Sequence, residues 1–138
     1  MGKVQNSMGV LPIPHIQEAR RYLSNAKEIL SEKAGKSGKF YSDKKYVRVA
    51  GNTAWNGILE ALDGTFDIRE SMKKNQRPDV KDYQQIIGKR NQTKLKVFNV
   101  AYDTLHKALG YDGNLSVAIV QEGLAEAEEI INWCESIK

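Results

Sequence analysis

The sequence predicts an all-α fold, an up-down antiparallel bundle of four long helices plus one short helix. Apolar residues recur at spacings of three and four over most of the chain, as in helices that bury one face. The breaks between these stretches are short, and short connections favour antiparallel neighbours. Only three prolines occur, and no stretch shows the alternation typical of a strand, so we expect no β-structure.

The first helix is predicted over residues 14–34. Pro14 suits its first turn, where a missing N–H costs nothing, and Gly35 is a typical terminator. The apolar stripe of this helix comprises Ile16, Ala19, Leu23, Ala26 and Leu30. Residues 35–39, G-K-S-G-K, lack the order of a phosphate-binding loop and follow a helix instead of a strand. We expect them to form a flexible loop.

The second helix is predicted from Ser42 or Asp43, either of which is a good N-cap, to about Lys74. Apolar residues cover most of its circumference, which is typical of a central helix. Three glycines lie inside it, at positions Gly51, Gly57 and Gly64. Each costs about 1 kcal/mol relative to alanine in an isolated helix. We therefore expect a neighbouring helix to approach closely at these positions.

Three further helices follow a break at residues 75–78, where a proline forces the preceding residue out of helical geometry. A short helix is predicted over residues 79–87 and a long one over residues 92–109, each followed by a glycine that ends it. The last helix is predicted from about residue 115 to the end of the chain.

The 138 residues fit one domain, and a content of 41% hydrophobic and 28% charged residues excludes a disordered chain. Residues 1–12 are small and polar, so we expect a flexible N-terminal arm and a single helical-bundle domain over residues 13–138. The sequence has no signal-peptide pattern and no run of about 18 apolar residues, so no membrane contact is expected. The lone cysteine, Cys134, fits a reducing compartment, and we expect a cytoplasmic protein.

Charge is distributed unevenly, although the net charge is only +4. Residues 1–96 carry 19 basic and 10 acidic residues, whereas residues 97–138 carry 2 basic and 7 acidic ones. If the two parts lie on different faces, the surface would attract an acidic partner or a second copy of the chain. The alternative is that both are ordinary solvated faces.

Polar residues recur beside the apolar stripes of the second and fourth helices. They are Asn52, Asn56, Asp63, Asn99, Asp103 and His106. If these helices are neighbours, the six residues form a polar seam, which is either a binding site or a patch that fixes helix register. Asp103 and His106 also have the i, i+3 spacing that lets a carboxylate orient an imidazole. No partnered nucleophile is identifiable, so no catalytic residue is predicted.

Metal ions and cofactors are not predicted. The sequence contains no C-x-x-C, H-E-x-x-H or paired E-x-x-H motif, and its two histidines and one cysteine lie far apart along the chain. Trp55 and Trp133 are expected in the core or at an interface.

A nucleic-acid partner is suggested by two basic segments, residues 36–48 and 69–96. Tyr41, Tyr46 and Tyr83 lie within these segments and could stack on bases. The alternative is that these tyrosines pack helix ends together.

Three stretches resemble the pattern of a small, uncharacterised bacterial family of helical bundles. They are A-G-N-T-A-W-N at residues 50–56, R-P-D-V-K-D-Y at residues 77–83 and A-Y-D-T-L-H-K at residues 101–107. This resemblance covers nearly the whole chain and implies no particular function.

Residues 46–63 also resemble the second helix of HEPN domains (higher-eukaryote and prokaryote nucleotide-binding domains), and residues 18–26 resemble the first. This resemblance implies a helical bundle that forms dimers and binds nucleotides or RNA. Active HEPN ribonucleases carry an R-x4–6-H motif. Here Arg90 begins such a motif, but the histidine positions hold other residues, Leu95, Lys96 and Val97. The resemblance therefore does not extend to ribonuclease activity.

The sequence thus leads to two main hypotheses. The first is a non-catalytic helical-bundle protein that acts by self-association or by binding a protein partner. The alternative is a HEPN-like nucleotide- or RNA-binding bundle without the intact ribonuclease motif. A third, less favoured hypothesis is an enzyme that uses Asp103 and His106.

Overall fold

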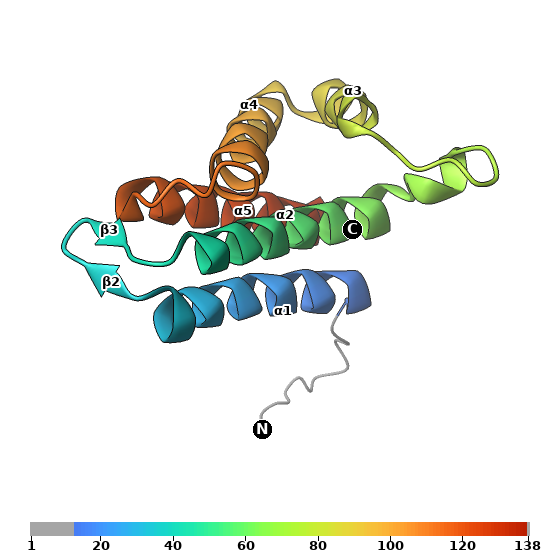
Figure 1. Cartoon of the computed structure of the whole chain (residues 1–138). Helices are drawn as coiled ribbons and strands as arrows, with labels where there is room; N and C mark the ends of the chain where they lie inside the picture. Colours follow the sequence, from blue (N-terminus) through green and yellow to red (C-terminus); the bar gives the residue numbers. More distant parts are fainter. Residues whose placement is uncertain (1–12, 138) are drawn as a thin grey trace.

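The computed structural model describes residues 13–137, so the expected N-terminal arm at residues 1–12 lies outside the described residues. The described part is an all-α bundle, as predicted (Figure 1). Its helices are α1 (Pro14–Ile29), α2 (Lys44–Phe66), α3 (Val80–Arg90), α4 (Gln92–Ala101) and α5 (Val117–Ile137). Two π-helical segments lengthen the bundle, because η1 (Leu30–Ala34) continues α1 and η3 (Tyr102–Leu109) continues α4. The bundle therefore has four long helical units, α1–η1, α2, α4–η3 and α5, and one short helix, α3.

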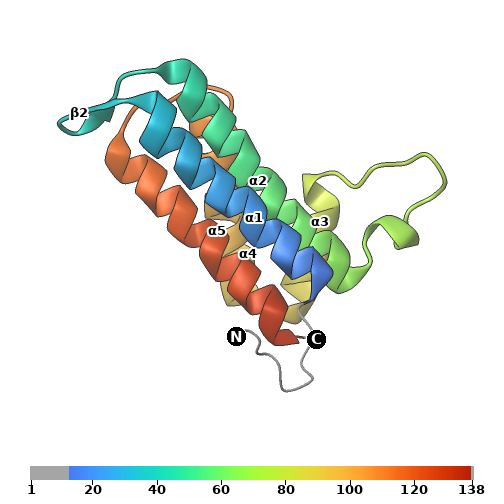
Figure 2. The same cartoon turned by 90° about the horizontal axis from the view of Figure 1, so that it is seen from below.

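The long helices run alternately up and down the bundle. Figures 1 and 2 show α1, α2 and α5 side by side, with α4 and η3 leaning across α2 and α5. Helix α2 packs against α1, α5 and η3, which confirms its predicted central position. Helix α3 packs chiefly on α4 and contacts the last turns of α2 through Tyr83 and Arg90. No helix among residues 13–137 has the length and apolar character needed to cross a membrane.

The core is built from the predicted apolar stripes. All five stripe residues of α1 and η1 are buried, and the same holds for Cys134 and most of the apolar side of α2. The largest side chains with almost no exposed surface include Phe98, Ile58, Leu62, Ile87, Leu105 and Ile131. Burying a side chain of this size contributes about 1.5–3 kcal/mol each. Helix periodicity therefore identified the residues that hold the bundle together.

A β-hairpin replaces the flexible loop that was expected after the first helix. Strands β2 (Lys36–Ser37) and β3 (Phe40–Tyr41) pair in an antiparallel register. The hairpin also contacts the start of α5, since the Tyr41 N–H donates to Leu115 O at 2.8 Å and the Val117 N–H donates to Lys39 O at 3.0 Å. The expectation of no β-structure is wrong here because each strand has only two residues, too few for any alternation to be visible.

Helix α2 ends at Phe66, eight residues before the predicted end at Lys74. Asp67 adopts a left-handed conformation with φ of 51°, which terminates the helix. One turn of 3-10 helix, η2 (Arg69–Ser71), follows, and the chain then leads to α3 without regular structure. Ile68 is nonetheless fully buried, so the apolar stripe continues past the end of the helix.

Helix α3 runs on to Arg90 and does not stop at Gly88 as predicted. Asp79 and Asp82 form a capping box at its start, with Asp79 accepting from the Asp82 N–H at 3.1 Å and Asp82 accepting from the Asp79 N–H at 2.8 Å. Asn91 ends α3 with extended geometry and, as the N-cap of α4, accepts from the Lys94 N–H at 3.0 Å. One asparagine thus serves as the junction of both helices.

Candidate functional site

The six residues of the predicted polar seam lie in two places. Asp63 and Asn99 lie towards α3, where Asp63 accepts from the Tyr83 hydroxyl at 2.8 Å and Asn99 accepts from Gln84 at 2.8 Å. The other four, Asn52, Asn56, Asp103 and His106, are exposed on α2 and η3. Among the described residues, no hydrogen bond joins any two of the six.

One member of the exposed group, His106, lies against two further rings, and we call Trp55, Tyr102 and His106 together the ring cluster. The Trp55 centroid lies 5.5 Å from that of Tyr102 and 5.8 Å from that of His106, and Tyr102 stacks on His106 at 5.4 Å. Trp55 is only 6% exposed, Tyr102 is half-buried and His106 is exposed. The cluster therefore presents two of its three rings at the surface.

Gly51 allows the ring cluster to form, because it lets η3 pack directly on α2. A Cβ at this position would lie 2.6 Å from Leu109 Cβ and 2.8 Å from Leu105 O. No side chain fits into this space, which explains one of the three glycines of the central helix. Gly57 serves in the same way against α1, where a Cβ would lie 3.0 Å from Ala19 O. The predicted close approach is confirmed, and it involves two different neighbours.

The end of η3 is held by a side chain of α2. Asn52 donates through Nδ2 to Gly110 O at 3.2 Å, which satisfies a carbonyl at the end of the π-helical segment. The Gly110 N–H donates to Leu105 O at 2.9 Å, so the wide i to i−5 pattern continues to the end. Asn52 therefore fixes η3, and with it the two exposed rings, on α2.

The geometry around His106 does not resemble a catalytic dyad. Asp103 forms an ion pair of 3.5 Å with Lys107, and the Lys107 ammonium lies 5.0 Å from the centroid of the Tyr102 ring. The imidazole contacts the faces of Tyr102 and Trp55. In a Ser-His-Asp arrangement a carboxylate orients the imidazole through a hydrogen bond. Among the described side chains Asp103 forms no such bond with His106 and pairs with Lys107 instead.

A second cluster joins residues from opposite ends of the sequence, which the sequence pattern did not reveal. His15 Nε2 lies 3.2 Å from Thr65 Oγ1, and both residues line a small pocket together with Cys134. Burial raises the pKa of the Cys134 thiol to about 11, so the thiol is neutral and a poor nucleophile at physiological pH. Within residues 13–137, no three side chains of His, Cys, Asp or Glu come together in a group that could hold a metal ion.

The acidic residues of α5 are largely paired with basic residues of the neighbouring helices. Arg20 of α1 lies 2.7 Å from Glu135, Lys27 of α1 lies 3.8 Å from Glu128, and Lys94 of α4 lies 2.8 Å from Glu129. The basic and acidic parts of the sequence therefore meet side by side instead of forming opposite faces. These exposed pairs contribute little to stability, but they reduce the dipolar field that would attract a second copy.

Two of the three tyrosines considered for base stacking are unavailable at the surface. Tyr41 is 5% exposed and Tyr83 is 4% exposed. Tyr46 is half-buried, with the ammonium groups of Lys33 and Lys45 at 5.7 Å and 5.2 Å from its ring centroid. The tyrosine most accessible to a ligand is Tyr111, which is 79% exposed in the turn after η3.

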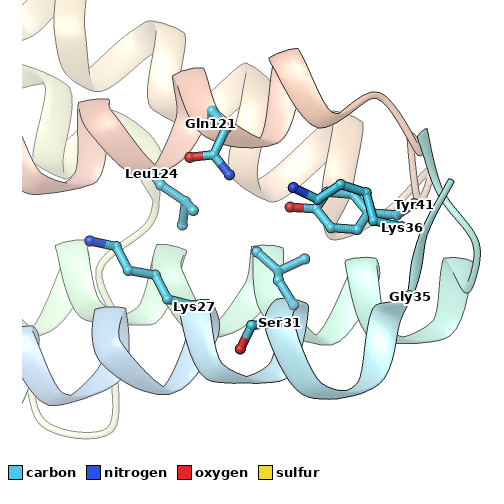
Figure 3. Close-up of a pocket in the computed structure, with 8 residues that line it drawn as sticks. Lys27, Ser31, Gly35, Lys36, Tyr41, Gln121 and Leu124 are labelled. Atoms are coloured by element: carbon cyan, nitrogen blue, oxygen red, sulfur yellow. The ribbon is translucent and has the colours of Figure 1, made fainter. Parts of the chain in front are cut away.

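The molecule also has a distinct pocket where α1, the hairpin and α5 meet (Figure 3). Its volume is about 580 Å³, and its lining combines polar side chains with the apolar Leu30 and Leu124. In Figure 3, α1 and α5 form two walls and the hairpin closes one end. None of the six residues of the predicted polar seam lines this pocket, but Lys36 and Tyr41, from the first of the two basic segments, do.

Comparison with solved structures shows a protein similar to this chain. A solved structure, a protein of unknown function from Dyadobacter fermentans, is 39% identical to the chain with a TM-score of 0.80. The match covers 89% of this chain and 94% of that one. No curated protein matches the chain. The likeness to HEPN domains is not tested by these matches and stays a prediction.

The family model described as a domain of unknown function, DUF5618, matches residues 14–136, which is almost the entire described part. Together with the Dyadobacter fermentans protein, this match shows that the chain belongs to the DUF5618 family.

Proposed function

We propose that the protein is non-catalytic and acts by association with a protein surface, above all with a second copy of itself, through the face formed by α2 and η3. The observation that carries this proposal is the ring cluster. Tyrosine and tryptophan are enriched at the centres of protein interfaces, where they combine a large apolar area with a polar group.

The surroundings of the ring cluster have the composition of an interface rim. On α2, the residues Val49, Asn52 and Asn56 share one side at spacings of three and four, and all three are exposed. On the α4–η3 unit, Val100, Asp103 and Lys107 also recur at spacings of three and four, and all three are exposed. Each of these two exposed stripes contains one exposed valine, 41% exposed for Val49 and 43% for Val100. Each stripe thus combines one exposed apolar side chain with amides or charged groups, a composition that suits a surface that becomes buried.

Light scattering coupled to size-exclusion chromatography at micromolar concentrations tests this proposal. We expect a mass of twice the 15.5 kDa of one chain. The variant Val49→Glu places a charge on the proposed face and should be monomeric, because an unpaired charge buried at an interface is strongly unfavourable. Ser24→Glu, at an exposed position of α1, is the matched control and should behave as the wild type. A wild-type protein that stays monomeric at every concentration refutes self-association.

A second candidate function, binding of RNA or a nucleotide, is favoured by a specific observation near the ring cluster. Gly113 lies against the side chains of Lys44 and Arg48, and a Cβ there would lie 3.2 Å from Arg48 Cγ. Arg48 and the exposed Tyr111 line a shallow cavity of about 530 Å³ together with Gly110 and the acidic Asp112. A cation beside an exposed ring is the arrangement that binds single-stranded nucleic acid.

Fluorescence anisotropy with a short labelled RNA across a salt series decides between the two candidates. If this second function is right, binding is strongest at low salt and Arg48→Gln weakens it, because phosphate contacts depend on salt. Lys89→Gln, an exposed lysine on α3, is the control. Absence of binding at low salt rules the second candidate out.

A further inference from the structure

The pocket between α1, the hairpin and α5 lies away from the ring cluster and is not used by the proposed function. Its volume of about 580 Å³ is within the range of roughly 300–1,000 Å³ that is usual for small-molecule sites. Leu30 and Leu124 are 5% and 6% exposed, so they form an apolar floor between the two helices. The pocket can therefore bury a compact apolar body.

The rim of this pocket is rich in hydrogen-bond donors and has no acidic member. Lys27 and Lys36 supply ammonium groups, Tyr41 a phenol and Gln121 a carboxamide. Figure 3 shows the polar ends of Lys36 and Tyr41 close to each other, with the Gln121 amide directed towards the same space. The Tyr41 hydroxyl forms no hydrogen bond with any described residue, although its ring is buried.

The two lysines differ in how much of their charge is already compensated. Lys27 lies 3.8 Å from Glu128, whereas Lys36 forms no ion pair within the described part of the chain. The rim thus has one positive charge without a nearby carboxylate, that of Lys36, and it lies beside the phenol of Tyr41. A single negative charge on the ligand matches this arrangement better than a neutral or dianionic group does.

The pocket is held in shape before any ligand binds. Gly35 has a φ of 65°, a conformation that side chains rarely adopt, and this turn directs the hairpin back over η1. The Tyr41 N–H donates to Leu115 O at 2.8 Å, which fixes the phenol relative to α5. The buried Tyr41 ring therefore loses little freedom when its hydroxyl binds a ligand, which favours the affinity of the pocket.

We propose that this pocket binds a small organic monocarboxylate with an apolar body. The carboxylate accepts hydrogen bonds from Lys36, Tyr41 and Gln121, and the apolar body lies on Leu30 and Leu124. Ammonium and phenol donors around a carboxylate form charge-assisted hydrogen bonds, which are about twice as strong as neutral ones. Because this site and the α2–η3 face share no residue, binding does not depend on self-association.

The proposal is tested by titrating the ¹⁵N-labelled full chain with 2-naphthoate. A proton–nitrogen correlation spectrum is recorded at each step of the titration. We expect shift changes concentrated in residues 27–41 and 121–124. We expect 2-naphthamide, which has the same body without the charge, to bind at least about tenfold more weakly, since the charge supplies the stronger contacts.

Two variants and one control locate the anion. Lys36→Gln should raise the dissociation constant at least about fivefold, and Tyr41→Phe, which keeps the ring but removes the donor, should raise it about threefold or more. Lys39→Gln removes a lysine from the same hairpin that does not line the pocket, and it should leave the constant unchanged. The spectra of the free variants show whether each one is folded.

Three results would each overturn the proposal. They are the absence of shift changes at the pocket up to about 10 mM naphthoate, equal binding of the carboxylate and the amide, and equal effects of Lys36→Gln and Lys39→Gln. Retained naphthoate binding in the Val49→Glu variant separates this proposal from the proposed function, which that variant is designed to disrupt.

Discussion

Replacing Glu126 with glutamine removes a carboxyl group that the fold holds in an unfavourable environment. Its Oε1 is buried without a hydrogen-bond partner among the described residues, and Glu122 and Glu129 lie one turn away on either side along α5. Burial first, and then the repulsion of these two neighbours, raises the pKa of Glu126 from 4.5 to about 7. The native state therefore favours the protonated carboxyl.

The sign of the pH effect follows from this shift. Between pH 4.5 and pH 7 the folded chain holds a proton on Glu126 that the unfolded chain has released, so the free energy of unfolding falls as the pH rises. The whole shift would correspond to about 3 kcal/mol at 1.36 kcal/mol per pKa unit. Because the side chain is partly exposed, solvent screening reduces the expected effect to about 1 kcal/mol.

Urea denaturation of the wild type and of Glu126→Gln, followed by circular dichroism from about pH 4 to about pH 8, measures the effect. The two proteins should be similarly stable at the acid end, and the variant should be about 1 kcal/mol more stable at the alkaline end. Glu32→Gln, at an exposed position of η1, is the control and should give a difference that does not change with pH. A difference for Glu126→Gln that is constant, or that shrinks as the pH rises, refutes the reasoning.

Three further outcomes are expected. Gly51→Ala should lower the free energy of unfolding by about 1–3 kcal/mol, because the new Cβ meets backbone atoms of η3. Gly88→Ala meets only the ends of two flexible side chains, Leu95 and Gln92, so urea denaturation should show no loss or a small gain. The Cys134 thiol should react with a disulfide reagent about 100-fold more slowly in the native protein at pH 8 than in urea, because its pKa is about 11 and it is 2% exposed. Tyr83→Phe should cost about 1.5–3 kcal/mol through the lost hydrogen bond to a carboxylate, whereas Tyr111→Phe, at a 79% exposed position, should cost nothing measurable.

The helices could be predicted because each of them buries one side. Ile16, Leu23 and Leu30 share a face at helical spacing, and all three are buried. The same reasoning placed α2 at the centre. It overestimated the length of α2, because a left-handed residue such as Asp67 leaves no pattern when it is not glycine. The hairpin escaped prediction because two-residue strands are stabilised by contacts with a distant segment and not by their own pattern.

For the candidate site, too, the sequence predicted which residues lie on a helix surface but not which distant residues they contact. Asn52 and His106 were identified as polar residues on helices that pack together, which is a property of each helix. What these residues contact was not predictable. Asp63 pairs with Tyr83 across 20 positions and His15 lies next to Thr65 across 50, so their partners are set by how the helices are placed in space. The carboxylate pocket is composed of residues from three separate segments and has no linear motif.

The bond between the Val117 N–H and Lys39 O has a consequence for how the chain assembles. A helix normally starts with amide groups that must find acceptors outside its own first turn. Here one acceptor for α5 is supplied by the hairpin that joins α1 and α2. This bond ties the 21-residue C-terminal helix to a connection about 80 positions earlier in the chain, so the α1–α2 connection forms part of the surface on which α5 docks.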